Sequence, residues 1–176
     1  IVHKIVLLIL VGFFGNLTIS GVGIGQLSGI NDDMLLVMDR TLPSFNLLND
    51  VNKNFLDSRI AILANIITND SEKKDAEMTR FHSDIKKIAD NLKLYEQLIP
   101  NDSLRLNFKN VHSMIEQYIK ESEVTLSLSN DYRAQEAKTN NEKLITVENN
   151  IISLLNKMVN DSETAARDLN TKDHEN

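Results

Sequence analysis

Apolar residues recur every three or four positions along most of the chain, which is the spacing of one face of an α-helix. The clearest stretch covers residues 71–98 and predicts one long helix. Its apolar seam comprises Met78, Phe81, Ile85, Ile88, Leu92, Tyr95 and Ile99. Pro100 ends this pattern, because proline is not tolerated in a helix interior, and Asn101 or Asp102 is expected to cap the next helix.

Two further helices are predicted after Pro100, over about residues 103–128 and 132–176. The inward seam of the first comprises Leu104, Phe108, Val111, Ile115, Tyr118, Ser122 and Thr125. That of the second comprises Leu144, Val147, Ile151, Leu154 and Met158. Between the two helices, the sequence Ser-Asn-Asp at residues 129–131 is typical of a capping turn.

The helix predicted before these covers about residues 30–68 and ends at a turn formed by Asn69 and Asp70. We expect Pro43 to kink this helix without ending it, because the apolar phase continues across it. Its predicted inward seam comprises Met38, Thr41, Phe45, Leu48, Asn52, Phe55, Arg59, Ile62 and Ile66. A second apolar face comprises Leu47, Val51, Leu56, Ile60, Leu63 and Ile67, and predicts weak dimerisation through this helix.

A membrane segment is predicted at the amino-terminal side, because residues 5–30 contain no charged residue and are long enough to cross a bilayer as a helix. Lys4 before this segment and Asp32 after it place the remainder of the chain outside the cytoplasm. A cleaved secretory peptide is the alternative, and it exports the chain as well. Gly21, Gly25 and Gly29 are spaced by four, which favours close helix packing in the membrane.

Four long helices joined by three short loops predict an all-α, antiparallel, up-down-up-down four-helix bundle, with its first helix continuous with the transmembrane helix. We therefore assign residues 1–29 to the membrane helix and residues 30–176 to one exported domain. The sequence Asn-Asp-Ser occurs at Asn69, Asn101 and Asn160. We interpret the first two as helix caps rather than glycosylation acceptors.

Composition excludes several classes of function. The chain carries a formal net charge of −6 and shows no basic patch, which argues against nucleic-acid binding. It contains no cysteine, so no disulfide or thiolate metal site is expected. A di-iron bundle needs Glu-x-x-His pairs, which this sequence lacks, and His82 and His112 fall at different heights along adjacent helices. We expect no catalytic residues, no metal, no cofactor and no enzymatic activity.

Arg59 is the leading candidate for ligand binding, because it interrupts an apolar seam and its planar guanidinium suits a carboxylate. The alternative is that its stem packs while its head reaches solvent or an acid of a neighbouring helix. Asn52 and Asn65 lie nearby on the same helix. Weaker candidates at the same end of the bundle are Arg133, Gln135 and Thr139.

The layout resembles the four-helix-bundle sensor domain of bacterial methyl-accepting chemotaxis receptors. The elements that carry the resemblance are the membrane helix leading into the bundle, Arg-x-Leu-Pro at residues 40–43, Leu-x-Ser-Arg at residues 56–59, and the opening NDYRAQEA of the last helix. The same bundle also serves some sensor kinases and diguanylate cyclases. A structural helical module without a small-molecule ligand is the remaining alternative.

The resemblance implies a homodimer in the bacterial inner membrane, with the bundle in the periplasm and a second membrane helix, a HAMP linker and a cytoplasmic coiled coil after it. It implies a ligand site at the membrane-distal end and signalling by a small displacement of the last helix. Because Arg59 is the one arginine of the first helix in that region, a small organic acid or similar solute, or a periplasmic binding protein, is expected as the partner.

Overall fold

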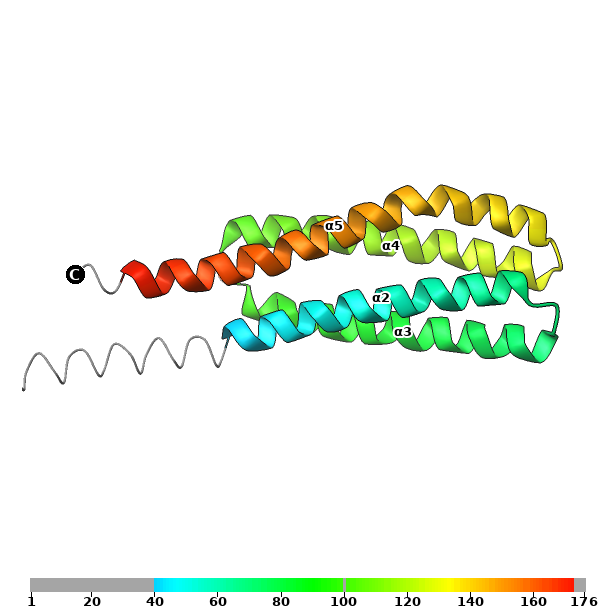
Figure 1. The fold of residues 1–176 in the computed structure, drawn as a ribbon, viewed down its shortest axis with the longest axis horizontal. Helices are drawn as coiled ribbons and strands as arrows, with labels where there is room; N and C mark the ends of the chain where they lie inside the picture. Colours follow the sequence, from blue (N-terminus) through cyan, green and yellow to red (C-terminus); the bar gives the residue numbers. More distant parts are fainter. Residues whose placement is uncertain (1–39, 100, 173–176) are drawn as a thin grey trace, which may run out of the picture.

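The computed structural model describes residues 40–99 and 101–172, and the regular structure in these residues consists of four helices (Figure 1). They are α2 (Leu42–Ile67), α3 (Ser71–Leu98), α4 (Asp102–Asn130) and α5 (Ala134–Lys172). Successive helices run in opposite directions, and the most extensive packing is within the pairs α2–α3 and α4–α5. The predicted all-α, antiparallel four-helix bundle is therefore confirmed.

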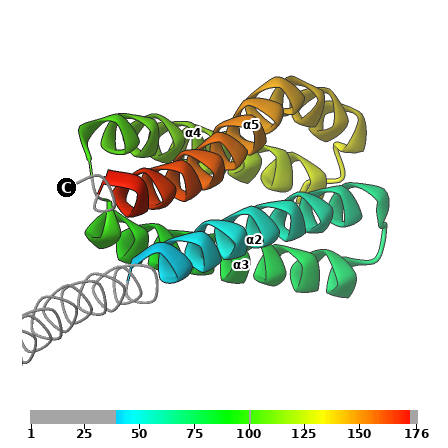
Figure 2. The same ribbon diagram turned by 60° about the vertical axis from the view of Figure 1, so that its left-hand side comes forward.

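The bundle consists of two helical hairpins, α2 with α3 and α4 with α5, which lie side by side in both orientations (Figures 1 and 2). Both hairpin connections, residues 68–70 and 131–133, lie at one end of the bundle, which we call the hairpin end. At the opposite end, α2 begins and α5 ends. The first and last helices therefore approach the same end of the molecule.

The helix starts confirm the predicted caps. The Asp70 side chain accepts hydrogen bonds from the backbone N–H groups of Glu72 and Lys73 at 3.0 and 3.3 Å. The Asn101 side chain accepts one from the backbone N–H of Leu104 at 2.9 Å. These bonds satisfy amide groups that have no partner within the first turn of a helix. Two of the three Asn-Asp-Ser sequences therefore lie at helix starts, as the capping interpretation requires.

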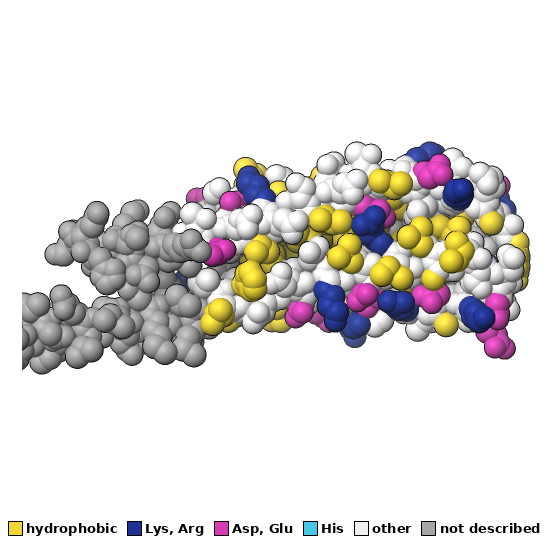
Figure 3. Space-filling view, viewed as in Figure 1, with side chains coloured by type: hydrophobic (Ala, Val, Ile, Leu, Met, Phe, Trp, Pro, Cys, Tyr) yellow, Lys and Arg dark blue, Asp and Glu magenta, His cyan; other side chains and the backbone are white. Residues whose placement is uncertain are grey.

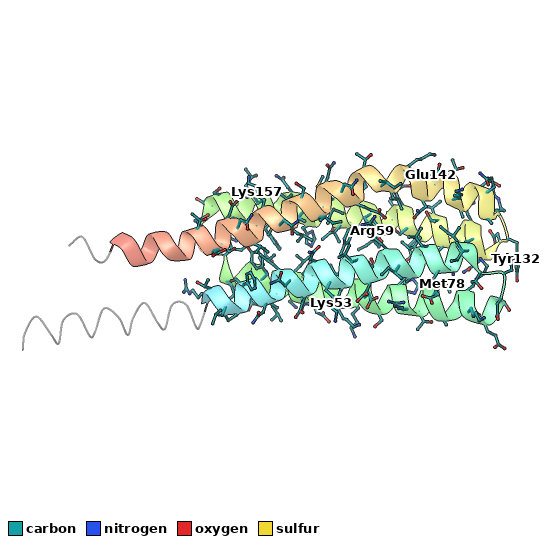
Figure 4. The ribbon with its side chains drawn as sticks, in the orientation of Figure 1. Lys53, Arg59, Met78, Tyr132, Glu142 and Lys157 are labelled. Atoms are coloured by element: carbon teal, nitrogen blue, oxygen red, sulfur yellow. The ribbon has the colours of Figure 1, made fainter. Side chains whose placement is uncertain are left out.

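The turn between α4 and α5 differs from the expected cap. Tyr132 adopts the left-handed backbone region with φ 59°. Its N–H donates to Ser129 O at 3.1 Å, and the N–H of Arg133 donates to Leu128 O at 2.9 Å. These two bonds form a Schellman motif, in which glycine is the usual residue at the left-handed position. The exposed Tyr132 side chain projects from the hairpin end (Figure 4).

The core runs along the axis of the bundle and confirms the seams predicted for α3 and α4. Met78 and Ile85 are partly buried, and the other predicted seam residues of these helices are buried. The fully buried aromatic side chains come from three helices: Phe55, Phe81, Tyr95 and Tyr118. Phe55 and Tyr118 have ring centroids 4.7 Å apart, so an aromatic contact joins α2 to α4 at mid-bundle.

The inward faces of α2 and α5 agree with the predicted seams at some positions and differ at those between them. The predicted positions that are buried are Leu48, Phe55 and Ile62 in α2, and Leu144, Ile151 and Met158 in α5. In α2, Val51 is fully buried and Phe45 is 41% exposed, which is the reverse of the prediction. In α5, Glu148 is buried in place of Val147. The buried residues of α2 are Ser44, Leu48, Val51, Phe55, Ser58, Ala61, Ile62 and Asn65. Because α2 is apolar on two sides, its sequence pattern is compatible with two rotations of the helix about its axis. Contacts with the other helices determine which rotation is adopted.

Pro43 lies in the first turn of α2, where its missing N–H costs no hydrogen bond. A short π-helical turn at Arg40 and Thr41 precedes it, so the backbone is helical on both sides of the proline. The membrane segment and its glycines, predicted for residues 5–30, fall outside the described residues. Over residues 40–99 and 101–172, none of the helices has the length and hydropathy needed for a membrane span.

Candidate functional site

Arg59 points from α2 toward α5, and its Nη2 lies 2.7 Å from Oε2 of Glu148. The Arg59 side chain is 26% exposed, whereas that of Glu148 is only 4% exposed. Figure 4 shows Arg59 between the ribbons of these two helices. Of the two interpretations of Arg59, the structure therefore shows the ion pair with an acid of a neighbouring helix.

The contact with Arg59 stabilises the ionised form of Glu148, whereas the burial of the carboxyl group destabilises it. Burial raises the pKa of the Glu148 carboxyl, and the charge and hydrogen bond of Arg59 act in the opposite direction. A buried carboxylate is costly unless it is paired. Arg59 is therefore the group that allows Glu148 to remain ionised inside the bundle.

Hydroxyl groups extend this contact to α4. Ser58 Oγ donates a hydrogen bond to Phe55 O at 2.7 Å and lies 3.1 Å from the Tyr118 hydroxyl. Burial raises the pKa of Tyr118 to about 12, with the nearby charge of Glu148 adding to the effect. Ser122 lies one turn further along α4, beside the Tyr118 hydroxyl, and its buried Oγ has no hydrogen-bond partner among the described residues.

We call this group the mid-bundle cluster, and it comprises Ser58, Arg59, Tyr118, Ser122 and Glu148. It joins α2 to α4 and α5, across the interface between the two hairpins. The cluster retains unused hydrogen-bonding capacity, since the Arg59 Nε and Ser122 Oγ atoms are buried without partners in the described part of the chain. Such capacity inside a core permits a second hydrogen-bond arrangement of the same groups.

A second polar cluster lies at the hairpin end and centres on Lys74, whose side chain is 4% exposed. Lys74 Nζ donates to the backbone oxygens of Asn65 and Ser129, both at 2.9 Å, and also to Ser129 Oγ. These backbone oxygens lie in the last turns of α2 and α4, where carbonyl groups lack partners and carry partial negative charge. The ammonium therefore caps two helix ends at once.

Asn65 completes this hairpin-end cluster. Its Nδ2 donates to Lys74 O at 2.8 Å and to Asn130 Oδ1 at 3.3 Å, while Ser129 Oγ donates to Asn65 O at 3.0 Å. Burial lowers the pKa of Lys74. Within a single chain, the predicted site residue Asn65 is therefore fully buried and engaged in contacts between helices.

The other predicted site residues lie apart from one another. Asn52 is partly buried, and its Oδ1 has no partner within the described residues. Arg133 is exposed and donates from Nε to Glu136 Oε1 at 2.8 Å. Gln135 and Thr139 are exposed, and the Thr139 hydroxyl donates to Gln135 O at 3.0 Å. A single protomer thus places the six residues at three locations rather than in one pocket.

Sequence reasoning missed two charged residues, although the same pattern that singled out Arg59 could have found them. Lys74 lies four positions before Met78 and so extends the α3 seam toward its start. Glu148 lies between Leu144 and Ile151 at seam spacing in α5. A charged residue at an otherwise apolar seam position indicates either a buried partner or a site. Applied to every helix, this rule identifies Arg59, Lys74 and Glu148, together with the buried Asp84 of α3.

The outward face of α2 carries exposed apolar side chains near its start and over its second half. Its exposed apolar side chains range from 40% exposure at Leu56 to 80% at Ile67, and the set is Leu42, Phe45, Leu56, Ile60, Leu63 and Ile67. Figure 3 shows apolar side chains spread over the side of the molecule on which α2 and α5 lie. In the described part of the chain, no three or more His, Asp or Glu side chains are grouped as a metal site.

The whole chain, residues 1–176, matches the family model described as a four helix bundle sensory module for signal transduction. No curated protein matches the chain at a significant level.

Proposed function

We propose, since the chain belongs to the family of four-helix-bundle sensory modules for signal transduction, that this bundle is the extracytoplasmic ligand-sensing domain of a bacterial chemoreceptor. The observation that carries the proposal is that α2 begins and α5 ends at the same end of the bundle, where a membrane anchor would meet both helices. The uncharged residues 5–30 precede α2 and supply a candidate anchor. The hairpin end then lies farthest from the membrane.

Signal transmission in this proposal is a displacement of α5 of about 1 to 2 Å along or across α2. The packing supports such a movement, because α5 approaches α2 less closely than it approaches its hairpin partner α4. Part of the contact between α2 and α5 is the polar Arg59–Glu148 pair rather than interlocked apolar side chains. A ligand that favours one packing of α5 shifts the population toward it.

The exposed apolar face of α2 is proposed as the contact with a second copy of the chain. Leu56, Ile60, Leu63 and Ile67 alternate steps of three and four, which is the seam of a two-helix contact. A stripe of this length is rarely left exposed by a soluble monomer. A homodimer would place two α2 helices side by side, with the hairpin ends of both copies adjacent.

Single-cysteine variants test both the dimer and its location, because the chain contains no cysteine of its own. We expect Leu63→Cys to form a disulfide-linked dimer in oxidised bacterial membranes. Lys109→Cys, exposed on α4, should not form one but should react in intact cells with a maleimide that cannot cross the inner membrane. Equal cross-linking of the two variants would contradict the α2 interface, and protection of Lys109→Cys until lysis would contradict the location.

A small organic acid or similar solute, or a periplasmic binding protein, is the proposed partner at the hairpin end. Arg133, Gln135 and Thr139 are exposed there, and a ligand carboxylate that reached Arg59 would compete with Glu148. We expect an acid of this class to raise the melting temperature of the chain, with about 2.7 kcal/mol of stabilisation at a hundredfold excess over its Kd. A thermal-shift screen with small mono- and dicarboxylates in which Arg133→Ala responds like the parent chain would argue against this site.

A further inference from the structure

Glu148 is buried where α5 meets two other helices, and polar groups on both of them interact electrostatically with its carboxyl group. Toward α2 it contacts Arg59 at 2.7 Å, and toward α4 it lies close enough to Tyr118 for its charge to affect the phenol. On α3, the buried carboxylate is Asp84, which is paired with Lys87 of the same helix at 2.9 Å. The neighbours of Glu148 along α5 are apolar: Leu144, Ile145, Ile151 and Ile152.

Ionisation decides which of these helices Glu148 prefers. An ionised carboxylate only accepts hydrogen bonds and is attracted to the guanidinium of Arg59, whereas a protonated carboxyl group also donates one. On α4, the Ser122 hydroxyl lies beside that of Tyr118 and lowers the phenol's pKa as a hydrogen-bonding neighbour, but its buried Oγ makes no hydrogen bond of normal length within the described residues, so it can accept such a bond. Arg59, with 26% of its side chain exposed, can turn its head to water once the charge opposite is removed.

We propose that Glu148 is a proton-binding site of the bundle, and that its protonation transfers the carboxyl group from Arg59 of α2 to the hydroxyl groups of Tyr118 and Ser122 on α4. The structure shows the arrangement in which the carboxyl group is paired with Arg59. Burial raises the pKa of Glu148, so it takes up a proton at a higher pH than an exposed glutamate does. The free energy for the rearrangement comes from removing a buried charge and from satisfying a buried hydroxyl.

The consequence is that acid loosens α5 from α2 and tightens it against α4. No other ligand is required, so this proton response goes beyond the proposed sensing of an organic acid. The role of this proton response in signalling rests on the proposed function, because that proposal assigns signal transmission to α5. The proton switch itself does not depend on that assignment and is measurable in this chain alone.

The distance between α2 and α5 tests the switch directly. Spin labels are attached at Lys53→Cys and Lys157→Cys, which are exposed on α2 and α5 (Figure 4). The full chain is placed in nanodiscs and diluted with unlabelled chain, so that distances within one copy dominate. As the pH is lowered stepwise from neutral to the lowest value at which circular dichroism shows a folded bundle, we expect the distance distribution to shift by about 1 to 2 Å. An unchanged distribution over this range would overturn the proposal.

Substitutions test whether Glu148 is the residue whose protonation causes the shift in distance. Glu148→Gln is permanently neutral and should show the acid distribution at every pH value. Glu142→Gln, the same change at an exposed position of α5, and Asp84→Asn, at the buried acid of α3, should retain the pH-dependent shift. Retention of the shift in Glu148→Gln, or its loss in either control, would assign the proton to another group and overturn the proposal.

A change on α4 provides a second, independent test. Ser122→Ala removes the proposed acceptor with little change in volume, and the midpoint of the distance shift should move to lower pH. An unchanged midpoint would show that Ser122 does not receive the proton of Glu148. Circular dichroism of each variant at neutral pH confirms that the bundle is folded before distances are compared. Because no organic acid or output domain is involved, failure here leaves the proposed sensory function untouched.

Discussion

Replacing Arg59 by alanine is expected to lower the free energy of unfolding at neutral pH by about 3 kcal/mol, the magnitude typical of leaving one member of a buried ion pair alone. The reason is that Glu148, 3% exposed, would lose its guanidinium partner, so the folded chain would bear the cost of an unpaired buried charge or of protonating the carboxyl group at neutral pH. The substitution also removes the stem of Arg59 from the α2–α5 interface. Glu148→Gln should change the stability by less than about 1 kcal/mol, because Arg59 can reach water when left alone.

The loss caused by Arg59→Ala should depend on pH. Arg59 is the group that counteracts the raised pKa of Glu148, so its removal raises this pKa further. An acid with a raised folded-state pKa binds more protons when folded than when unfolded, so it destabilises the fold as pH rises from the unfolded to the folded pKa. The variant should therefore regain part of its stability as the pH falls through the folded-state pKa of Glu148.

Urea unfolding of the chain in detergent micelles, followed by circular dichroism at neutral and acidic pH, measures both effects. The double variant Arg59→Ala with Glu148→Gln should recover most of the loss, because no buried charge remains. This non-additivity is the signature of a direct interaction between the two residues. A variant Arg59→Ala as stable as the parent chain at neutral pH would show that the pair contributes nothing to the fold.

Lys74→Met is expected to lower the free energy of unfolding by about 2 kcal/mol, because hydrogen bonds from a charged group contribute about 1.5 to 3 kcal/mol each and the acceptors keep only weaker donors. Methionine keeps an unbranched apolar side chain of similar length but supplies no donor to the backbone oxygens of Asn65 and Ser129. Removal of a buried positive charge offsets part of this loss. The damage should be concentrated at the hairpin end, where Lys74 joins three helices.

Hydrogen exchange measures which part of the bundle loses stability in this variant. The amides of the last turns of α2 and α4 should exchange faster in Lys74→Met, while those near Tyr95, at the other end of the bundle, should be little affected. Lys73→Met is the matched control, because the neighbouring Lys73 side chain is 74% exposed and only distantly paired with Asp70. Equal effects of the two substitutions would mean that the buried hydrogen bonds of Lys74 do not hold the hairpin end together.

Much of the fold was predictable because its determinants are local. Helices α3 and α4 each have a single apolar face. The spacing of their apolar residues by three or four positions was therefore sufficient to predict which side chains turn inward. Pro100 and the capping residues Asp70 and Asn101 defined where these helices begin and end. Their chemistry acts within one helical turn, so the sequence alone contains the necessary information.

The polar contacts within the bundle were only partly predictable, because they depend on pairing across distant parts of the chain. The pattern marked Arg59 as an interruption of the seam but left its partner open, and the structure identifies that partner as Glu148. The buried position of Lys74 was missed, since lysine is normally exposed and only the carbonyls of two other helices make its burial tolerable. The ligand-binding roles of all six candidate residues remain predictions: Arg59, Asn52, Asn65, Arg133, Gln135 and Thr139.

By itself, the sequence determined that this protein forms four antiparallel helices, because helix formation, capping and the width of an apolar face depend on neighbouring residues. The tertiary structure alone decided the rotation of α2 and α5 about their axes. One residue corresponds to about 100° of rotation, and a helix with two apolar faces satisfies its own pattern in more than one orientation. Packing against the other helices removed that ambiguity, buried Val51 and Glu148, and left the apolar face of α2 exposed.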